Sequence, residues 1–265
     1  MIALLAVGFA AGFSGGLFGI GGGVITTPVL YALFQVMGFS DETCLKTAIG
    51  TSLAIIIVTS LRSLLTHHQA GFVDGKILKD WTPWIALGAG AGGFLARWAP
   101  AELLTIIFTG GAFWVAYRRL FKSGHSSGKV TDLGRKRMKV PLGIGTGLFS
   151  SLMGIGGGAL GVMIMTVAGR PMHQAIGTSA GFGVAVAVPG VLGFIYSGSS
   201  TLDLPPMSLG YMNIPAFMVM AAMAAIAAPL GAKVAHRIHG DLLSKIFGAY
   251  VFIAACALAY DIFSG

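Results

Sequence analysis

Two glycine clusters hold the residues best suited to contact a small solute. GLFGIGGG at 16–23 contains Gly19, Gly21, Gly22 and Gly23, and SLMGIGGG at 151–158 contains Gly154, Gly156, Gly157 and Gly158. At Gly21, Gly22, Gly156 and Gly157 the backbone is expected to adopt left-handed angles and come close to a ligand, because glycine has no Cβ. Successive N–H groups in such turns receive an anion, and a helix that starts just after each cluster, near Val24 or Ala159, adds its N-terminal partial positive charge. An anion is therefore the favoured ligand.

Close helix packing is the competing explanation for these glycines, since small residues are common where membrane helices meet. Packing accounts for some of the 41 glycines in the chain. A cluster of four glycines at matched positions, 135 residues apart, favours a binding role for the clusters themselves.

A second repeated motif supplies hydroxyl groups. AIGTS occurs at 48–52 and again at 175–179, and it places Thr51, Ser52, Thr178 and Ser179 near the starts of the helices that come after each glycine-broken hairpin. These hydroxyls could donate to a substrate oxygen, or each could bond the carbonyl four residues earlier in its own helix. Thr26 and Thr27 face the same choice but are weaker candidates, because Gly161 and Val162 stand at the matching positions.

Other chemistry has little support in the sequence. His67 and His68 lie together without a third ligand, His173 and Arg170 are expected in a loop, and Arg62 is close enough to a helix end for its guanidinium to reach the membrane surface. No metal, cofactor or buried proton relay is expected. The chain contains no Walker, H-E-x-x-H or G-x-S-x-G motif, and neither Cys44 nor Cys256 has a neighbouring base, so we do not expect an enzyme.

The composition defines the class of protein that must position these motifs. Of 265 residues, 55% are hydrophobic and only 10% are charged, with a mean hydropathy of +0.84. So few charged residues cannot cover the surface of a water-soluble protein. The same composition, with only two cysteines, excludes a disordered chain, a secreted disulfide scaffold and, despite the net charge of +8, a nucleic-acid binder. The chain is expected to be an all-α polytopic membrane protein in contact with the lipid bilayer. Its apolar N-terminus lacks the basic start of a cleaved signal and is expected to belong to the mature fold.

Apolar runs and repeats divide the chain into two related halves. The runs are 2–38, 47–66, 81–98, 102–121, 140–168, 175–197, 212–235 and 243–263. The first and fifth are too long for a single span and are broken at their glycine clusters. We expect a first membrane repeat at 1–121, a basic cytoplasmic linker at 122–139 and a second membrane repeat at 140–265.

The distribution of basic residues indicates how each broken run lies in the membrane. If each folds back as a hairpin, only Lys46 and Arg97 of the 17 Lys and Arg residues lie outside, whereas a single crossing would place four more there. Each half is then a glycine-broken hairpin plus three spans, the two halves are inverted, and both termini are external. Inverted repeats with broken helices that meet at the membrane midplane are a recurring design of transporters.

The two glycine motifs, both copies of AIGTS and the basic linker together resemble the sulfite exporter TauE/SafE family, also called the toluene sulfonate uptake permease family. The resemblance covers nearly the whole chain. It implies a permease of the prokaryotic inner (plasma) membrane for a small sulfur-containing oxyanion or organosulfonate, such as sulfite, a sulfonate or sulfoacetate.

We therefore expect a secondary permease that moves a small anion by alternating access between the two glycine bends, coupled to protons or sodium. A passive anion channel, an intramembrane enzyme and a non-transporting assembly subunit remain alternatives. The homodimer is one candidate oligomeric state.

Overall fold

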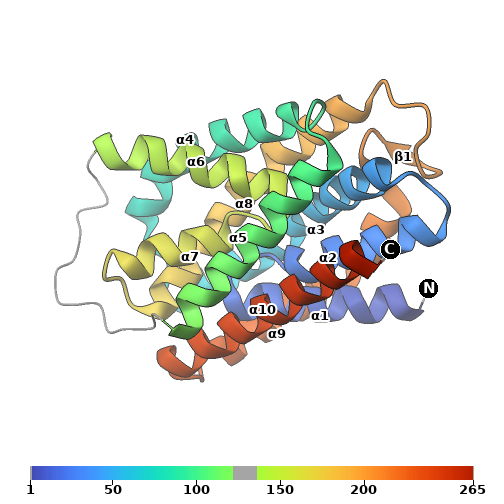
Figure 1. The fold of residues 1–265 in the computed structure, drawn as a ribbon. Coiled ribbons are helices and arrows are strands. Elements are labelled where there is room, and N and C mark those ends of the chain that lie inside the picture. Colours follow the sequence, from blue (N-terminus) through green and yellow to red (C-terminus); the bar gives the residue numbers. More distant parts are fainter. Residues whose placement is uncertain (1, 122–135, 265) are drawn as a thin grey trace.

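The fold is described from a computed structural model that covers residues 2–121 and 136–264, and it is built almost entirely of helices (Figure 1). The helices of the first half are α1 (Ile2–Phe18), α2 (Gly23–Val36), α3 (Asp41–Gln69), α4 (Gly75–Leu95) and α5 (Ala101–Phe121). Those of the second half are α6 (Lys136–Met153), α7 (Gly158–Val167), α8 (Met172–Gly198), α9 (Ile214–Ala235) and α10 (Gly240–Ser264). A short antiparallel hairpin of β1 (Ser208–Leu209) and β2 (Met212–Asn213) joins α8 to α9.

The breaks expected at the glycine clusters are present. The first apolar run is divided into α1 and α2, and the fifth into α6 and α7. In Figure 1 the α1–α2 pair opens toward the end where the N- and C-termini lie, and the α6–α7 pair opens toward the opposite end. Helices α2 and α7 begin within one residue of the positions expected from the sequence.

The start of α3 differs from the expectation. Ser40 caps this helix by accepting the N–H of Thr43, and Asp41 and Glu42 in the first turn favour its partial positive end. The helix therefore begins six residues before the apolar run at 47–66, and Cys44 and Lys46, which precede that run, are buried within it. Consequently Thr51 and Ser52 lie well inside α3 rather than near its start.

Three of the described helices are long and apolar enough to cross a membrane, namely α3, α8 and α9, and four shorter apolar helices accompany them. Helices α3 and α8 pack against each other, and about two thirds of the apolar window of each is buried inside the protein. The chain is an all-α membrane protein with these two helices at its centre.

The two halves pack against each other in a reciprocal way. Helix α1 lies along α9 and α6 lies along α4, so the first helix of each half contacts the fourth helix of the other. Glycines make both contacts close: a Cβ on Gly12 would overlap the backbone of Ala224, and a Cβ on Gly147 would overlap the backbone of Ile85. Such close approach is the usual way in which membrane helices gain van der Waals contact.

Candidate functional site: two glycine bends

Both breaks adopt the backbone angles that only glycine accepts readily. Positive φ values between 62° and 85° occur at Gly19, Gly21, Gly22, Gly154 and Gly156. The expectation of left-handed angles is confirmed for Gly21, Gly22 and Gly156 and is wrong for Gly157, which has φ −68° and ψ −6°. Gly157 is required for space instead, because a Cβ there would lie 2.7 Å from the carbonyl oxygen of Phe182.

The two bends are in direct contact. A Cβ on Gly23 would overlap the carbonyl oxygen of Gly154, and a Cβ on Gly158 would overlap the carbonyl oxygen of Gly19. These two contacts are equivalent, since Gly154 and Gly158 follow Gly19 and Gly23 by the same 135 residues. The bends, far apart in the sequence, thus form one buried centre between the halves.

Hydroxyl groups from α2 and α3 satisfy carbonyl groups of these bends. Ser52 donates to the carbonyl of Gly154 at 3.0 Å, and Thr27 contacts the same oxygen at 3.3 Å. Thr59 donates to the carbonyl of Gly21 at 2.7 Å, and the Thr26 and Ser52 hydroxyls lie 2.6 Å apart. The hydroxyls therefore satisfy the carbonyls of Gly21 and Gly154, one in each bend.

The N–H groups of the bends are in a different situation. Among residues 2–121 and 136–264, no hydrogen-bond acceptor serves the N–H groups of Ile20, Gly21, Gly22, Ile155, Gly156 and Gly157. All six residues are buried. Because buried N–H groups in native proteins are nearly always paired, these donors call for an acceptor beyond the described residues, such as water or a negatively charged solute.

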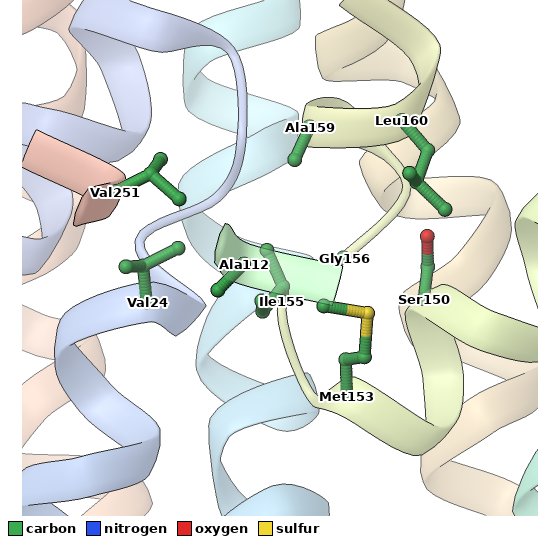
Figure 2. Close-up of a pocket in the computed structure, with 9 residues that line it drawn as sticks. All are labelled: Val24, Ala112, Ser150, Met153, Ile155, Gly156, Ala159, Leu160 and Val251. Atoms are coloured by element: carbon green, nitrogen blue, oxygen red, sulfur yellow. The ribbon is translucent and has the colours of Figure 1, made fainter. Parts of the chain in front are cut away.

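A small cavity of about 10 Å³ lies beside the second bend (Figure 2), at the lower limit of the space that holds one water molecule. Its lining comes from α2, α5, α6, α7, α10 and the second bend, and comprises Val24, Ala112, Ser150, Met153, Ile155, Gly156, Ala159, Leu160 and Val251. Ser150 is 1% exposed, and its hydroxyl has no partner among the described residues. Figure 2 shows this side chain pointing from α6 toward α7.

The AIGTS motifs join the halves together. Thr51 accepts the N–H of Asn213 at 2.9 Å, and Thr178 accepts the N–H of Asp74 at 2.9 Å. Asn213 and Asp74 are the N-cap residues of α9 and α4, so each motif fixes the start of a helix in the opposite half. Neither threonine bonds the carbonyl four residues earlier, which was one of the two expected alternatives.

The serines of the two motifs differ from each other. Ser52 donates to the second bend, as described above, whereas the Ser179 hydroxyl is buried and has no partner in the described part of the chain. A Cβ on Gly161 of α7 would lie 2.8 Å from the Ser179 hydroxyl oxygen, which places Ser179 against the helix that follows the second bend.

Three hydroxyl residues near the bends were not selected from the sequence. Ser150 stands one turn before the second glycine cluster, but the matching position in the first half is Gly15, so comparison of the repeats gave no reason to choose it. Thr27 was given low weight for the same reason. Thr59 lies two turns after AIGTS, and its spacing from Ser52 on one face of a helix is the signal that could have identified it.

The fold and its buried backbone breaks define a polytopic membrane protein built in the manner of a transporter. Residues 4–258 match the model of the family described as sulfite exporter TauE/SafE, and the chain belongs to this family.

Relatives in bacteria and archaea extend over nearly the same length. A probable membrane transporter protein of Haemophilus influenzae is 32% identical over 254 residues, which are 95% of each chain. One from Methanocaldococcus jannaschii is 29% identical over 257 residues, 92% of this chain and 91% of the relative. One from Bacillus subtilis is 26% identical over 281 residues, 98% of this chain and 97% of the relative. No solved structure matches the chain. The protein is a membrane transporter of this family.

Proposed function

We propose that the protein is a secondary permease that moves a small anion across the membrane, with the anion bound between the two glycine bends. The observation that carries this proposal is the set of six buried N–H groups, contributed by both bends, that have no acceptor among the described residues. The carbonyls of Gly21 and Gly154 already accept hydroxyl groups, which leaves fewer acceptors for a cation. The starts of α2 and α7 add partial positive charge at the same place.

The proposed site consists of the eight bend glycines with hydroxyl groups around them. Ser179 and Ser150 are buried and unpaired within the described residues, so each has a hydrogen to donate to an oxyanion. Thr51 and Thr178 each accept one N–H, which leaves their own hydroxyl hydrogens for a substrate oxygen. Ser52 supports the site by fixing the carbonyl of Gly154. Binding through partial charges suits transport, because the anion must also be released.

The small volume of the cavity favours alternating access over a passive channel. A space of about 10 Å³ holds at most one water molecule and is too small for a sulfur oxyanion. The bends must separate before such a solute enters, and we propose that the two halves rock against each other to expose the site to each side in turn.

We further propose that the halves are inverted repeats in a prokaryotic inner (plasma) membrane. The opposite openings of the α1–α2 and α6–α7 pairs and the reciprocal packing of α1 with α9 and α6 with α4 support this proposal. The basic linker would then face the cytoplasm, with both termini outside. The family description makes a sulfur oxyanion or an organosulfonate the first substrate class to examine.

The direct test is thermal unfolding and proteoliposome uptake with sulfite, thiosulfate, methanesulfonate, sulfoacetate and simple carboxylates. A bound substrate raises the melting temperature, because it stabilises only the folded protein. Counterflow should accelerate uptake of the same anion, as it does for a carrier and not for a channel.

The variants Gly22→Val and Gly157→Val should each abolish uptake while the protein remains in the membrane. Normal uptake by both variants would contradict a site between the bends, and absence of flux with every anion would favour an assembly subunit.

A further inference from the structure

A cluster of three histidines lies where the ends of α3 and α9 meet the start of α8. His67 is 1% exposed, and its ring nitrogens contact two groups: Nε2 lies 3.1 Å from the carbonyl oxygen of Gly16, and Nδ1 lies 2.9 Å from Nε2 of His236. His173 contacts the carbonyls of Ala235 and Ile238 at 3.2 and 3.0 Å. The Phe72 ring packs against both His173 and His236.

The partners of His67 determine where its proton is. A carbonyl oxygen can only accept, so Nε2 of His67 must carry a hydrogen and Nδ1 must have a free electron pair. Nε2 of His236 then donates to that pair. The result is a continuous chain of hydrogen bonds from the partly exposed His236, through the buried His67, to Gly16 in the last turn of α1, three residues before the first bend begins.

We propose that the His67–His236 pair binds the coupling proton of transport and passes its charge toward the first glycine bend. An incoming proton adds to the free Nδ1 of His236, and the hydrogen on Nε2 of His236 moves to Nδ1 of His67. His236 becomes neutral again, and His67 becomes an imidazolium that donates to Gly16 through Nε2. The pair gains one proton, and the positive charge ends on the buried His67 rather than on the partly exposed His236. This proposal rests on the proposed permease function.

The matching position in the other half shows that this place accommodates a cation. Lys46 stands two residues before the first AIGTS, as His173 stands two residues before the second. The buried ammonium of Lys46 pairs with the Glu42 carboxylate at 2.6 Å and also lies near the Arg97 carbonyl and over the Tyr211 ring. His173 likewise lies against the Ala235 carbonyl and the Phe72 ring, but Gly169 stands where the first half has Glu42. Carbonyls at the ends of helices favour positive charge. One half therefore carries a cation that is paired with a carboxylate at this place, and the other carries groups that titrate and have no carboxylate partner in the described residues.

The surroundings of the pair contain other ionisable groups, but no described acidic residue is in contact with it. Helix α1 contributes no ionisable side chain, and α3 contributes Arg62 and the exposed His68. Helix α9 and the turn after it contribute Lys233, Arg237 and His239. From the start of α10 come Asp241 and Lys245. From α8 and the loops come His173, Arg170 and Asp74, the last two being an ion pair at 4.0 Å. Protonation is therefore unsupported by a carboxylate in this conformation.

Because no carboxylate stabilises the protonated pair in this conformation, the proton affinity of the pair can differ between conformations. Such a difference couples proton binding to conformational change. Burial, followed by the charge of His173, lowers the pKa of His236, which lies just past α9. The conformation described here thus favours the neutral pair, and a conformation that hydrates the pair would bind a proton more tightly. By linkage, acid shifts the protein toward that second conformation.

The first experiment measures the proton site without substrate, in the full-length protein labelled with ¹⁵N-histidine in lipid bilayers. As the pH falls from about 8 to about 4, a range that extends well below the ordinary histidine pKa of ~6.5, NMR should show His67 and His236 gaining one shared proton, and burial of His236 places this titration on the acid side of the ordinary value. The variants His67→Gln and His236→Gln should remove this joint titration, and His68→Gln, which changes the exposed neighbour, should keep it. A pair that stays neutral throughout, or a titration unchanged in His67→Gln, would overturn the proposal.

The second experiment measures coupling, with methanesulfonate as the probe and a pH-sensitive dye inside proteoliposomes. In wild-type protein and His68→Gln, a methanesulfonate gradient should move protons, whereas His67→Gln and His236→Gln should lose proton movement but keep methanesulfonate counterflow. Proton movement retained in both variants would refute the coupling role. Absence of any methanesulfonate flux in wild-type protein would count against the proposed permease function for this anion, and the NMR titration would still decide for or against the proton site.

Discussion

At the residue scale, the chemistry of the bends depends on which backbone groups find partners within the protein. Ser52 and Thr59 donate to bend carbonyls, while six bend N–H groups have no acceptor in the described residues. Leaving a buried donor unpaired costs about 1–3 kcal/mol. A conformation that retains several such groups regains this free energy when water or an anion binds, and this gain is the basis of the proposed anion site.

The unpaired hydroxyl of Ser150 leads to the first prediction. If this group donates to the bound anion, Ser150→Ala should weaken binding by about 1 kcal/mol, or roughly fivefold. Anion-dependent shifts in melting temperature measure the affinity. Ser199→Ala is the matched control, because Ser199 is the exposed C-cap residue of α8 and its hydroxyl donates to the carbonyl of Tyr196 in that helix. Equal affinity of the Ser150 variant and the control would place Ser150 outside the anion site.

At the element scale, the two bends are held together by backbone contacts that leave no space for side chains. Gly23 begins α2 and Gly158 begins α7, and each contacts the opposite bend directly. Glycine is needed at these two positions because a Cβ would not fit, and not because of unusual backbone angles. Neither half can form this centre alone, since each bend supplies one face of it.

The contact at α7 gives the second prediction. Gly158→Ala should separate the bends, because the added Cβ would overlap the carbonyl oxygen of Gly19. We expect loss of uptake and a destabilisation of roughly 1–3 kcal/mol, as for overpacking in a core. In the control Gly145→Ala, the new Cβ has nothing within 4 Å, so uptake and stability should be unchanged or slightly higher. Thermal unfolding and uptake are measured for both variants. Equal stability and equal uptake of the two variants would contradict a close contact at Gly158.

The AIGTS motifs give the third prediction. Thr178→Val and Thr51→Val keep the shape of the side chain but leave the N–H of Asp74 or Asn213 without its acceptor. Each should lower the free energy of unfolding by about 1–3 kcal/mol, and the two effects should be similar because the contacts are equivalent. Thr82→Val, which removes a hydroxyl bonded within its own helix, should have a smaller effect. A Thr82 variant as unstable as the other two would contradict a special role for the motifs.

At the scale of the whole molecule, stability comes from contacts between the halves. The first helix of each half packs on the fourth helix of the other, and α5 packs on α10. The central helices α3 and α8 join at the middle. A rocking motion of the halves must therefore act at these same interfaces.

This packing predicts how the halves behave when separated. Residues 1–121 and 122–265, expressed individually, should be degraded or should aggregate, because the close-packed faces of α1 and α6 lose their partners. Co-expression of the two segments should restore folded protein and anion uptake. A stable first half on its own, detected as a monodisperse species after purification, would contradict the reciprocal packing.

The sequence by itself determined the class and the broken helices. A charged content of 10% requires a membrane environment, and four glycines inside an apolar run are enough to interrupt a helix. Both properties are local, so the positions of the bends were correct to within one residue. The start of α3 was predicted too late, because the helix begins at its N-cap Ser40 and not where the apolar run begins.

Only the tertiary structure decided what each motif touches. That the two bends meet, that Thr51 and Thr178 hold helices of the opposite half, and that Ser150 and the His67–His236 pair are buried are relations between segments more than 100 residues apart. No periodicity or propensity encodes such relations, since they follow from how closely the small faces of the helices allow the two halves to approach each other.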